Sequence, residues 1–197
     1  DENNIDSVVF SKTDLTLNGS GSLTIDAQAG HGVVSKDELT INGGTFTVDS
    51  VDDCLHSGGA LAVTGGTFTL SSGDDAIHSD DAVTIRAGEF SIPYCYEGVE
   101  GLSVTVEGAA FDVIAHDDGF NAAGGADSSG FGGRDEPFAA SEDSFITVHG
   151  GTITVVSDGD CLDSNGDLTV NGGTLDLTCN GNGNTALDCS GSYTNNG

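Results

Sequence analysis

A ten-residue pattern recurs along the chain, and this repetition restricts the possible folds more than any other feature. Successive copies begin 21 to 24 residues apart, except for one interval of 42 residues, which is one period plus an insertion of similar length. The copies are LTINGGTFTV at Leu39, LAVTGGTFTL at Leu61, VTIRAGEFSI at Val83, VTVEGAAFDV at Val104, ITVHGGTITV at Ile146 and LTVNGGTLDL at Leu168, after a looser copy at Leu15. A period of this length indicates a solenoid, in which a repeat buries its apolar side only by stacking on its neighbours.

Each repeat contains the pattern of three short strands. Leu39 and Ile41 alternate with Thr40, and Phe46 and Val48 continue the alternation after a Gly-rich corner, where positive φ is cheap for glycine. A third strand follows an acidic corner and contributes one large apolar residue per repeat. The predicted inward column is Val34, Leu55, Ile77, Val99, Phe120, Leu162 and Leu187. The sequence therefore predicts an all-β fold, a single-stranded right-handed parallel β-helix of about seven coils of 21–22 residues.

Stacking converts each repeat position into a ladder with a spacing of about 4.8 Å. The ladder expected to form the core is Phe46, Phe68, Phe90, Phe111, Ile153 and Leu175. Residues 1–197 are expected to form one β-helix domain. Two segments depart from the repeat: a Gly-, Ser- and Asp-rich stretch at 123–144, predicted to be a surface loop, and the C-terminal run GSYTNNG, predicted to be an incomplete coil.

The charge balance excludes several classes of partner. The chain has 32 acidic residues against 4 basic residues, which gives a formal net charge of −28 at pH 7. Binding to nucleic acid requires basic patches, so no nucleic-acid partner is expected, and an anionic membrane surface is disfavoured for the same reason. No apolar run approaches the ~20 residues of a transmembrane helix, so membrane insertion is not expected. The chain is expected to be a monomer.

Carboxylates concentrate at the acidic corner before each third strand. The candidate metal ligands there are Asp52, Asp53, Asp74, Asp75, Glu97, Asp117, Asp118, Asp158 and Asp160. Carboxylates on adjacent coils repel and raise one another's pKa unless a cation lies between them. Oxygen ligands in flexible turns suit Ca²⁺, which accepts 6–8 of them, better than Mg²⁺. The sequence therefore predicts bound Ca²⁺, with a solvated acidic rim of turn-forming residues as the alternative.

A polar ladder follows on the third strand, on the face that the acidic corners share. It consists of His56, His78, Glu100, Asn121, Asp163 and Asp188. One hypothesis makes this ladder, together with Tyr94 and Tyr96 as stacking platforms, a polysaccharide-binding groove. The alternative is that it is the polar solvent side of a strand. The histidines lie on different coils without the spacing of zinc ligands, so no structural zinc is expected.

Five cysteines leave at least one unpaired. Cys54 and Cys161 share one column of small residues but lie four coils apart, which excludes a bond between them. Cys179 and Cys189 fall in one coil, where a disulfide is possible, and Cys95 is expected to be free.

Taken together, these repeats resemble a carbohydrate-binding parallel β-helix family of plant-biomass-degrading clostridia. The resemblance rests on the LTINGGTFTV-type strands, the corners at 52–57 and 74–79, the segment SDGDCLDSNGDLTVNGGT at 157–174 and the terminal GNGNTALDCSG, and it covers about residues 30–191. Tyr96-Glu97 and Gly159-Asp160 depart from the double-Asp corners. The resemblance implies a pectate-lyase-like fold, bound Ca²⁺, and binding of cellulose and polygalacturonate without lyase activity.

These arguments lead to a non-catalytic module that binds an acidic plant cell-wall polysaccharide, polygalacturonate or pectin with cellulose as a further ligand, through Ca²⁺. The resemblance supplies the ligand class, and the net charge supplies the mechanism, because a polyanion approaches this chain only across a bridging cation. An extracellular or cell-surface location is expected. Two other classes stay open: a calcium-dependent polysaccharide lyase, for which Lys12, Lys36, Arg86 and Arg134 are the available bases, and a structural stalk or adhesin.

Overall fold

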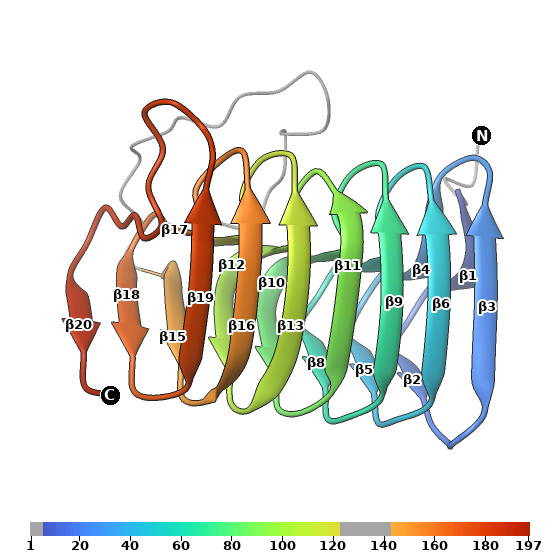
Figure 1. The fold of residues 1–197 in the computed structure, drawn as a ribbon. Coiled ribbons are helices and arrows are strands. Elements are labelled where there is room, and N and C mark those ends of the chain that lie inside the picture. The colour runs from blue at the N-terminus through green and yellow to red at the C-terminus, as the bar shows by residue number, and fades with distance from the viewer. Residues whose placement is uncertain (1–5, 123–142) are drawn as a thin grey trace.

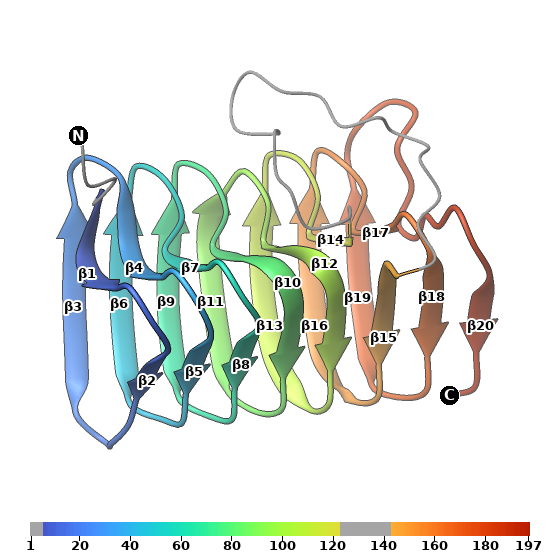
Figure 2. The same cartoon turned by 180° about the vertical axis from the view of Figure 1, so that it is seen from behind.

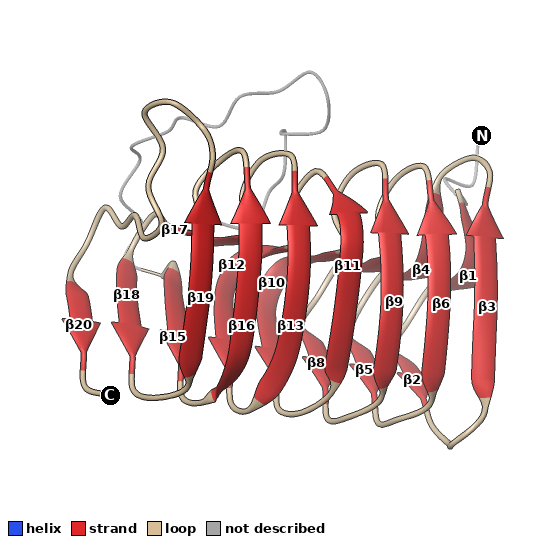
Figure 3. Ribbon diagram, viewed as in Figure 1, coloured by secondary structure: helices blue, strands red, loops and turns tan. Residues whose placement is uncertain are grey.

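The computed structural model describes residues 6–122 and 143–197. In these residues all regular structure is β-strand, as Figure 3 shows. No helix in this part of the chain is long and apolar enough to cross a membrane.

The strands form two parallel sheets that face each other across the apolar core. The front sheet of Figure 1 is seven-stranded and contains one strand from each turn. Its strands are β3 (Ser22–Ala27), β6 (Thr45–Ser50), β9 (Thr67–Ser72), β11 (Glu89–Cys95), β13 (Ala109–Ala115), β16 (Gly151–Ser157) and β19 (Thr174–Cys179). The acidic corners follow the C-terminal ends of these strands, and the Gly-rich corners precede their N-terminal ends.

The second sheet is thirteen-stranded and folds around the rear of the molecule in two rows, seen in Figure 2. One row contains β1 (Ser7–Ser11), β4 (His31–Ser35), β7 (Leu55–Ser57), β14 (Phe120–Ala122) and β17 (Leu162–Ser164). The other contains β2 (Leu15–Leu17), β5 (Leu39–Ile41), β8 (Leu61–Val63), β15 (Phe145–Val148), β18 (Asp167–Val170) and β20 (Tyr193–Asn195). The long strands β10 (Ile77–Ile85) and β12 (Val99–Val106) run through both rows and join them.

The predicted parallel β-helix is confirmed, with about eight turns where the sequence predicted about seven. The additional rung comes from β20, which pairs in parallel with β18 through Leu168 and Tyr193. Each turn rises through the front sheet, crosses to the rear and descends as the chain advances toward the C-terminus, which is the right-handed sense (Figures 1 and 2).

The predicted core ladder is also confirmed. Phe46, Phe68, Phe90 and Phe111 stack with nearly parallel rings, at centroid separations of 5.0, 4.5 and 4.4 Å. Ile153 and Leu175 continue the column through parallel pairing of β13, β16 and β19. Because every rung is apolar on the inside, the stack forms one continuous core from one end of the solenoid to the other.

Three details differ from the sequence prediction or lie beyond the structure. Val33 pairs with Leu55, so the inward third-strand column begins at Val33 and not at Val34. Both valines are buried, so their apolar character did not distinguish them, and only the backbone register did. No disulfide joins Cys179 to Cys189, and all five cysteines are free. The predicted loop at 123–144 lies outside the described residues except for its last two positions.

Candidate functional site

The acidic corners of successive turns align into one column along the solenoid, called here the corner column. Its members are His31, Asp53, Asp75, Glu97, Asp118 and Asp160, one from each turn. Several of these side chains accept a hydrogen bond from the backbone amide of the next member: Asp53 Oδ1 from Asp75 at 3.0 Å, and Asp118 Oδ1 from Asp160 at 2.6 Å. The column therefore has a structural role, because it satisfies backbone donors at corners where the sheet ladder is interrupted.

At the N-terminal end, two histidines share one carboxylate. Asp53 Oδ2 lies 2.8 Å from His56 Nδ1 and 3.2 Å from His31 Nδ1. Burial opposes ionisation of Asp53, but the hydrogen bonds from His31 and His56 outweigh it and lower the pKa of the carboxyl group. Burial likewise opposes protonation of His31, and the hydrogen bond and charge of Asp53 outweigh it and raise the His31 pKa. This end of the column is compensated in charge.

One turn further along, His78 lies among three carboxyl groups. Its Nδ1 is 2.8 Å from Glu100 Oε2 and 3.1 Å from Asp75 Oδ2, and its Nε2 is 3.2 Å from Asp80 Oδ1. Burial opposes the charged imidazolium, but hydrogen bonds to Asp75, Asp80 and Glu100 raise the pKa of His78. Burial, together with the charges of Asp53 and Glu100, raises the pKa of Asp75, and Asp75 Oδ1 is buried without a hydrogen-bond partner.

Beyond His78 no basic side chain of the described residues approaches the column. Glu97 is buried, and within the described residues its carboxylate accepts hydrogen bonds from the Asn121 side-chain amide, at 3.1 and 3.2 Å. Burial and the charges of Asp75, Glu100 and Asp118 raise the pKa of Glu97. The carbonyl oxygen of Asn121 has no partner although it is buried. The side-chain amide of Asn121 therefore stabilises the Glu97 carboxylate by its dipole, without an opposite charge.

The C-terminal end is a group of carboxylates that are partly open to solvent. Oxygens of Asp160, Asp163 and Asp188 lie within 4.8 Å of one another, and Asp118 lies on the preceding turn. Burial and the charges of Asp117 and Asp163 raise the pKa of Asp118 to about 8. Burial and the charges of Asp160 and Asp188 raise the pKa of Asp163 to about 6. We call Asp118, Asp160, Asp163 and Asp188 the open carboxylate group.

The other predicted metal ligands do not join these groups. Asp52 and Asp74 are half-buried at the second and third acidic corners. Asp117 accepts a hydrogen bond from the Tyr96 hydroxyl, which raises the pKa of the tyrosine. Asp158 is exposed, with its carboxylate 3.6 Å from the His116 ring nitrogen. A metal ion at the open carboxylate group would therefore draw its ligands from the column and the neighbouring third strand.

Three members of the third-strand polar ladder do not face solvent, so the alternative of a polar solvent side does not hold for them. His78, Glu100 and Asn121 are buried: His78 and Asn121 contact Asp75 and Glu97 of the corner column, and Glu100 contacts His78. His56 and Asp163 are half-buried. None of these findings tests the prediction that the ladder binds sugar, but direct contact with a ligand is open only to the accessible members.

Exposed aromatic and apolar side chains lie on the outer face of the seven-stranded sheet. Tyr94 is 50% exposed and contacts the His116 ring edge-on, at a centroid distance of 4.9 Å. Ile114 on the next strand is 49% exposed. Tyr96 is half-buried at the acidic corner. Tyr94 is thus the accessible member of the predicted aromatic pair, and it lies beside the end of the sheet from which the acidic corners continue.

Sequence reasoning missed His31 and did not place Asp80 or Asp188 among the site residues. The signal for His31 was the period itself, because His31 precedes Asp53 by the same 22 residues that separate Asp53 from Asp75. Asp188 occupied the predicted polar ladder but was not assigned to the metal. Asp80 carried no periodic signal, because it lies in the bulge where β10 changes register between Ser79 and Ala82.

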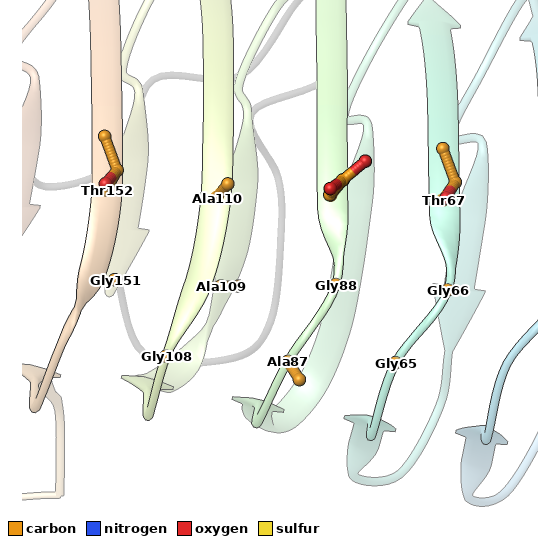
Figure 4. Close-up of a pocket in the computed structure, with 11 residues that line it drawn as sticks. Gly65, Gly66, Thr67, Ala87, Gly88, Gly108, Ala109, Ala110, Gly151 and Thr152 are labelled. Atoms are coloured by element: carbon orange, nitrogen blue, oxygen red, sulfur yellow. The ribbon is translucent and has the colours of Figure 1, made fainter.

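A shallow groove of about 620 Å³ crosses four turns at the Gly-rich corners, at the other end of the seven-stranded sheet (Figure 4). Glycine and small residues of the corners line it together with the first strand residues, Thr67, Glu89, Ala110 and Thr152. Gly66 and Gly88 have φ values of +127° and +137°, so glycine is required there by the backbone. Among the lining residues Glu89 is the one charged side chain, so the groove has few groups that could bind a polar ligand or take part in catalysis.

The available bases are distant from the open carboxylate group. Arg86 is placed at a Gly-rich corner, where its Nε is 3.5 Å from Glu107. Lys12 and Lys36 belong to the first turns, and Arg134 lies outside the described residues. What the described arrangement can do chemically is bind cations and hydrogen-bond hydroxyl groups.

Comparison with known proteins agrees with a binding role. No curated protein and no solved structure matches this chain. A family profile described as "Carbohydrate-binding domain-containing protein" matches residues 1–183, which is most of the chain. The solenoid with its acidic corner column therefore belongs to this family of carbohydrate-binding domains.

Proposed function

We propose that this domain binds an acidic plant cell-wall polysaccharide, polygalacturonate or pectin, and that Ca²⁺ at the open carboxylate group bridges protein and ligand. The observation that carries the proposal is the accumulation of Asp118, Asp160, Asp163 and Asp188, which make no salt bridge to a basic side chain among the described residues. Grouping raises the pKa of carboxyl groups of this kind, and a cation between them favours the ionised form.

The donor set of the open carboxylate group fits Ca²⁺. The group offers carboxylate oxygens of Asp160, Asp163 and Asp188 within 4.8 Å of one another, and its partial exposure leaves room for water or ligand oxygens in the remaining positions. Ca²⁺ accepts 6–8 oxygens at 2.3–2.6 Å in irregular geometry, whereas Mg²⁺ requires a near-ideal octahedron. When bound, the ion supplies positive charge that both protein and ligand carboxylates can coordinate.

The net charge supports bridging over direct contact. A chain at −28 repels a polyanion, and screening at ~0.15 M salt shortens this repulsion to ~8 Å without reversing it. Guanidinium groups, the alternative ligands for sugar carboxylates, are represented by Arg86 and Arg134 alone. A cation held by the protein is thus the simplest way for a uronate carboxylate to approach the acidic corner.

Tyr94 and the accessible polar groups provide the remaining contacts. The exposed Tyr94 ring presents an apolar surface on which a sugar ring can stack, and Asp163 and His56 can accept or donate hydrogen bonds to hydroxyls. The same tyrosine is available to a neutral glucan such as cellulose, which needs no ion. We expect cellulose to be the weaker ligand, because Tyr94 has no coplanar exposed aromatic neighbour among the described residues.

The proposed role is non-catalytic. A calcium-dependent lyase needs a base beside the ion to remove the proton alpha to the uronate carboxyl group, and Arg86 is instead paired with Glu107 at the opposite corner. An absorbance assay for unsaturated products on polygalacturonate separates the two functions, because a binding module releases none. A stalk or adhesin would bind no glycan at any Ca²⁺ concentration. We place the domain outside the cell, where both the polysaccharide and Ca²⁺ occur.

Affinity-gel electrophoresis in polygalacturonate tests the proposal directly. We expect retardation in millimolar Ca²⁺ and free migration in excess chelator. Retardation that persists in chelator would exclude bridging, and free migration in Ca²⁺ would exclude the ligand.

A matched pair of variants then locates the ion. Asp163→Asn with Asp188→Asn should abolish the calcium-dependent retardation. Asp49→Asn with Asp112→Asn removes the same charge from the exposed outer face of the seven-stranded sheet and should retain it. Equal behaviour of the two double variants would show that the net charge matters and the open carboxylate group does not.

A further inference from the structure

The N-terminal end of the corner column holds a second set of metal-ligand atoms, of a different chemical kind from the open carboxylate group. Two imidazole nitrogens, His31 Nδ1 and His56 Nδ1, converge on Asp53 Oδ2, at 3.2 and 2.8 Å. All three ligand atoms lie within 4.8 Å of one another. The geometry points to a binding site for a divalent transition metal, of which Zn²⁺ is the representative probe, at His31, Asp53 and His56.

The separations suit a bound ion. Metal–ligand bonds of about 2.1 Å in tetrahedral geometry place two ligand atoms about 3.4 Å apart. The distances of 3.2 and 2.8 Å from Asp53 Oδ2 to the two imidazole nitrogens require movements of only a few tenths of an ångström to reach this value. Metal binding takes place at deprotonated imidazole, so it replaces the protons that otherwise link the histidines to the carboxylate.

The ligands are held in place by groups outside the set. Asp53 Oδ1 accepts a hydrogen bond from the Asp75 amide at 3.0 Å, which orients the carboxylate. The His56 ring stacks on His78 at a centroid distance of 4.8 Å and an interplanar angle of 3°, which fixes its plane. The Asp53 backbone N–H lies 3.1 Å from His31 Nδ1 and donates to this nitrogen only when the nitrogen carries no proton, so a metal ion on Nδ1 would take the place of that hydrogen bond. Such outer contacts raise affinity by pre-orienting the ligands.

The donor types select the metal. Imidazole nitrogens suit Zn²⁺, Cu²⁺ and Ni²⁺, whereas Ca²⁺ and Mg²⁺ prefer oxygen. The two imidazole side chains are each 18% exposed, so an ion can enter and keep an open position for water or a hydroxyl group. The neighbouring set of Asp75, His78 and Glu100 has similar donors but is buried, and carboxyl groups engage both ring nitrogens of His78. The first set is therefore the accessible one.

This site is independent of the proposed calcium bridge. It lies on the first turns of the solenoid, the open carboxylate group lies on the last turns, and the two differ in donor type. A titration with Zn²⁺ in the presence of saturating Ca²⁺ therefore leaves the oxygen sites out, because Ca²⁺ occupies them and competes poorly for imidazole. The half-buried thiols of Cys179 and Cys189 stay available to Zn²⁺, so the histidine variants are needed to assign the binding.

Isothermal titration calorimetry with Zn²⁺ in saturating Ca²⁺ is the experiment. We expect one saturable site in the natural sequence and affinity roughly tenfold or more weaker in His31→Gln and in His56→Gln. His149→Gln, which changes an exposed histidine whose ring contacts Asn171 at a Gly-rich corner, is the matched control and should bind as the natural sequence does. Unchanged affinity in both site variants, or no saturable binding in the natural sequence, would overturn the proposal.

Two further measurements guard against a variant that does not fold. Co²⁺ added to the natural sequence should give the intense visible absorption of a four-coordinate ion, and a weak six-coordinate spectrum would contradict the proposed ligands. Zn²⁺ should also raise the melting temperature of the natural sequence, because an ion that binds only the folded state stabilises it. His31→Gln should lose this increase while its circular dichroism spectrum stays that of the β-solenoid.

Discussion

The two ends of the corner column have equivalent backbones and opposite electrostatics. At the N-terminal end, His31 and His56 share the carboxylate of Asp53, and His78 lies among Asp75, Asp80 and Glu100. At the C-terminal end, the open carboxylate group has no basic partner among the described residues. The same structural position thus holds a compensated charge in one half of the solenoid and an uncompensated charge in the other.

The difference shows that the repeat determines where a corner side chain lies but not whether its charge is compensated. Asp53 and Asp118 both accept a hydrogen bond from the backbone amide of the next turn, so both satisfy a backbone donor at the corner. Their pKa shifts nevertheless have opposite signs, because burial is outweighed by histidine at Asp53 and reinforced by Asp117 and Asp163 at Asp118. One end is arranged for internal stability, and the other needs an ion from outside.

The largest change in the free energy of unfolding is expected when the carboxylate shared by the two histidines is removed. Asp53→Asn leaves His31 and His56 without their shared counter-charge in a largely buried position, and removing one partner of a buried ion pair costs about 3 to 5 kcal/mol. Chemical denaturation at pH 7 should show this loss. Asp49→Asn, an exposed substitution on the same turn, is the control. A loss below 1 kcal/mol would mean that the two ends do not differ in the way their contacts indicate.

Calcium should act on the C-terminal end alone. An ion that binds only the folded state adds about 2.7 kcal/mol at a concentration of 100 times Kd. Differential scanning calorimetry should therefore show a higher melting temperature in Ca²⁺ than in chelator. The increase should vanish in Asp163→Asn with Asp188→Asn and persist in Asp49→Asn with Asp112→Asn. A melting temperature that is independent of Ca²⁺ in the natural sequence would remove the proposed ion.

The response of stability to pH should report on the open carboxylate group. A carboxyl group with a raised folded pKa binds its proton more tightly in the folded state, so stability falls as pH rises from the unfolded value near 4 to the folded value, about 6 for Asp163 and about 8 for Asp118. In chelator we expect a loss on the order of 2 kcal/mol between pH 5 and pH 8. The lowered pKa of Asp53 has the opposite sign, so its contribution is present above about pH 4 and is lost progressively as pH falls below that value. The raised pKa of His31 adds a loss with rising pH of the same sign as that of Asp118, so a variant at Asp118 is needed to assign the C-terminal part.

Asp118→Asn is the control for this pH dependence. It retains an oxygen that can accept the Asp160 amide hydrogen bond but removes the titrating charge, so its stability in chelator should fall less between pH 5 and pH 8. Saturating Ca²⁺ should flatten the profile of the natural sequence in the same way. A profile that rises with pH in chelator would contradict the assignment of uncompensated charge to this end.

The smallest effect concerns the ligand and not the fold. Tyr94→Ala removes an exposed ring, so stability should change by less than about 0.5 kcal/mol. Affinity for polygalacturonate in Ca²⁺ should weaken about fivefold, the loss of about 1 kcal/mol of stacking. Tyr193→Ala, an equally exposed ring on the last strand β20, is the control in affinity-gel electrophoresis. Equal retardation of the two variants would show that Tyr94 does not contact the sugar.

Much of the fold was predictable because a solenoid is nearly one-dimensional. The Phe46, Phe68 and Phe90 stack followed from the period, since each residue packs on its counterpart one repeat away. The run that contains β20 was predicted only as an incomplete coil, and not as an eighth turn, because Tyr193, Thr194 and Asn195 lack the apolar pattern. The shift from Val34 to Val33 had no signal in composition, since two adjacent valines fit the same column.

The sequence predicted where the candidate site lies in the fold, but it did not predict which of its side chains contact one another. The acidic corners and the third-strand ladder do lie side by side, as the repeat required. The alternation of polar and apolar residues along the third strand indicated only which side chains point away from the apolar core. It did not indicate that His78 and Glu100 would be buried. Asp80 was invisible to the period because it lies in a bulge of β10.

The sequence by itself determined the columns: which residues recur, at what spacing, and on which side of each strand. This is possible because parallel stacking repeats the same geometry every turn and needs only local alternation to define inside and outside. Only the tertiary structure decided that His31 takes the place of a carboxylate in the first turn and converges with His56 on Asp53. The physical reason is that charge compensation depends on distances of 3 to 4 Å between side-chain atoms of different turns, and the repeat specifies neighbours without specifying those contacts.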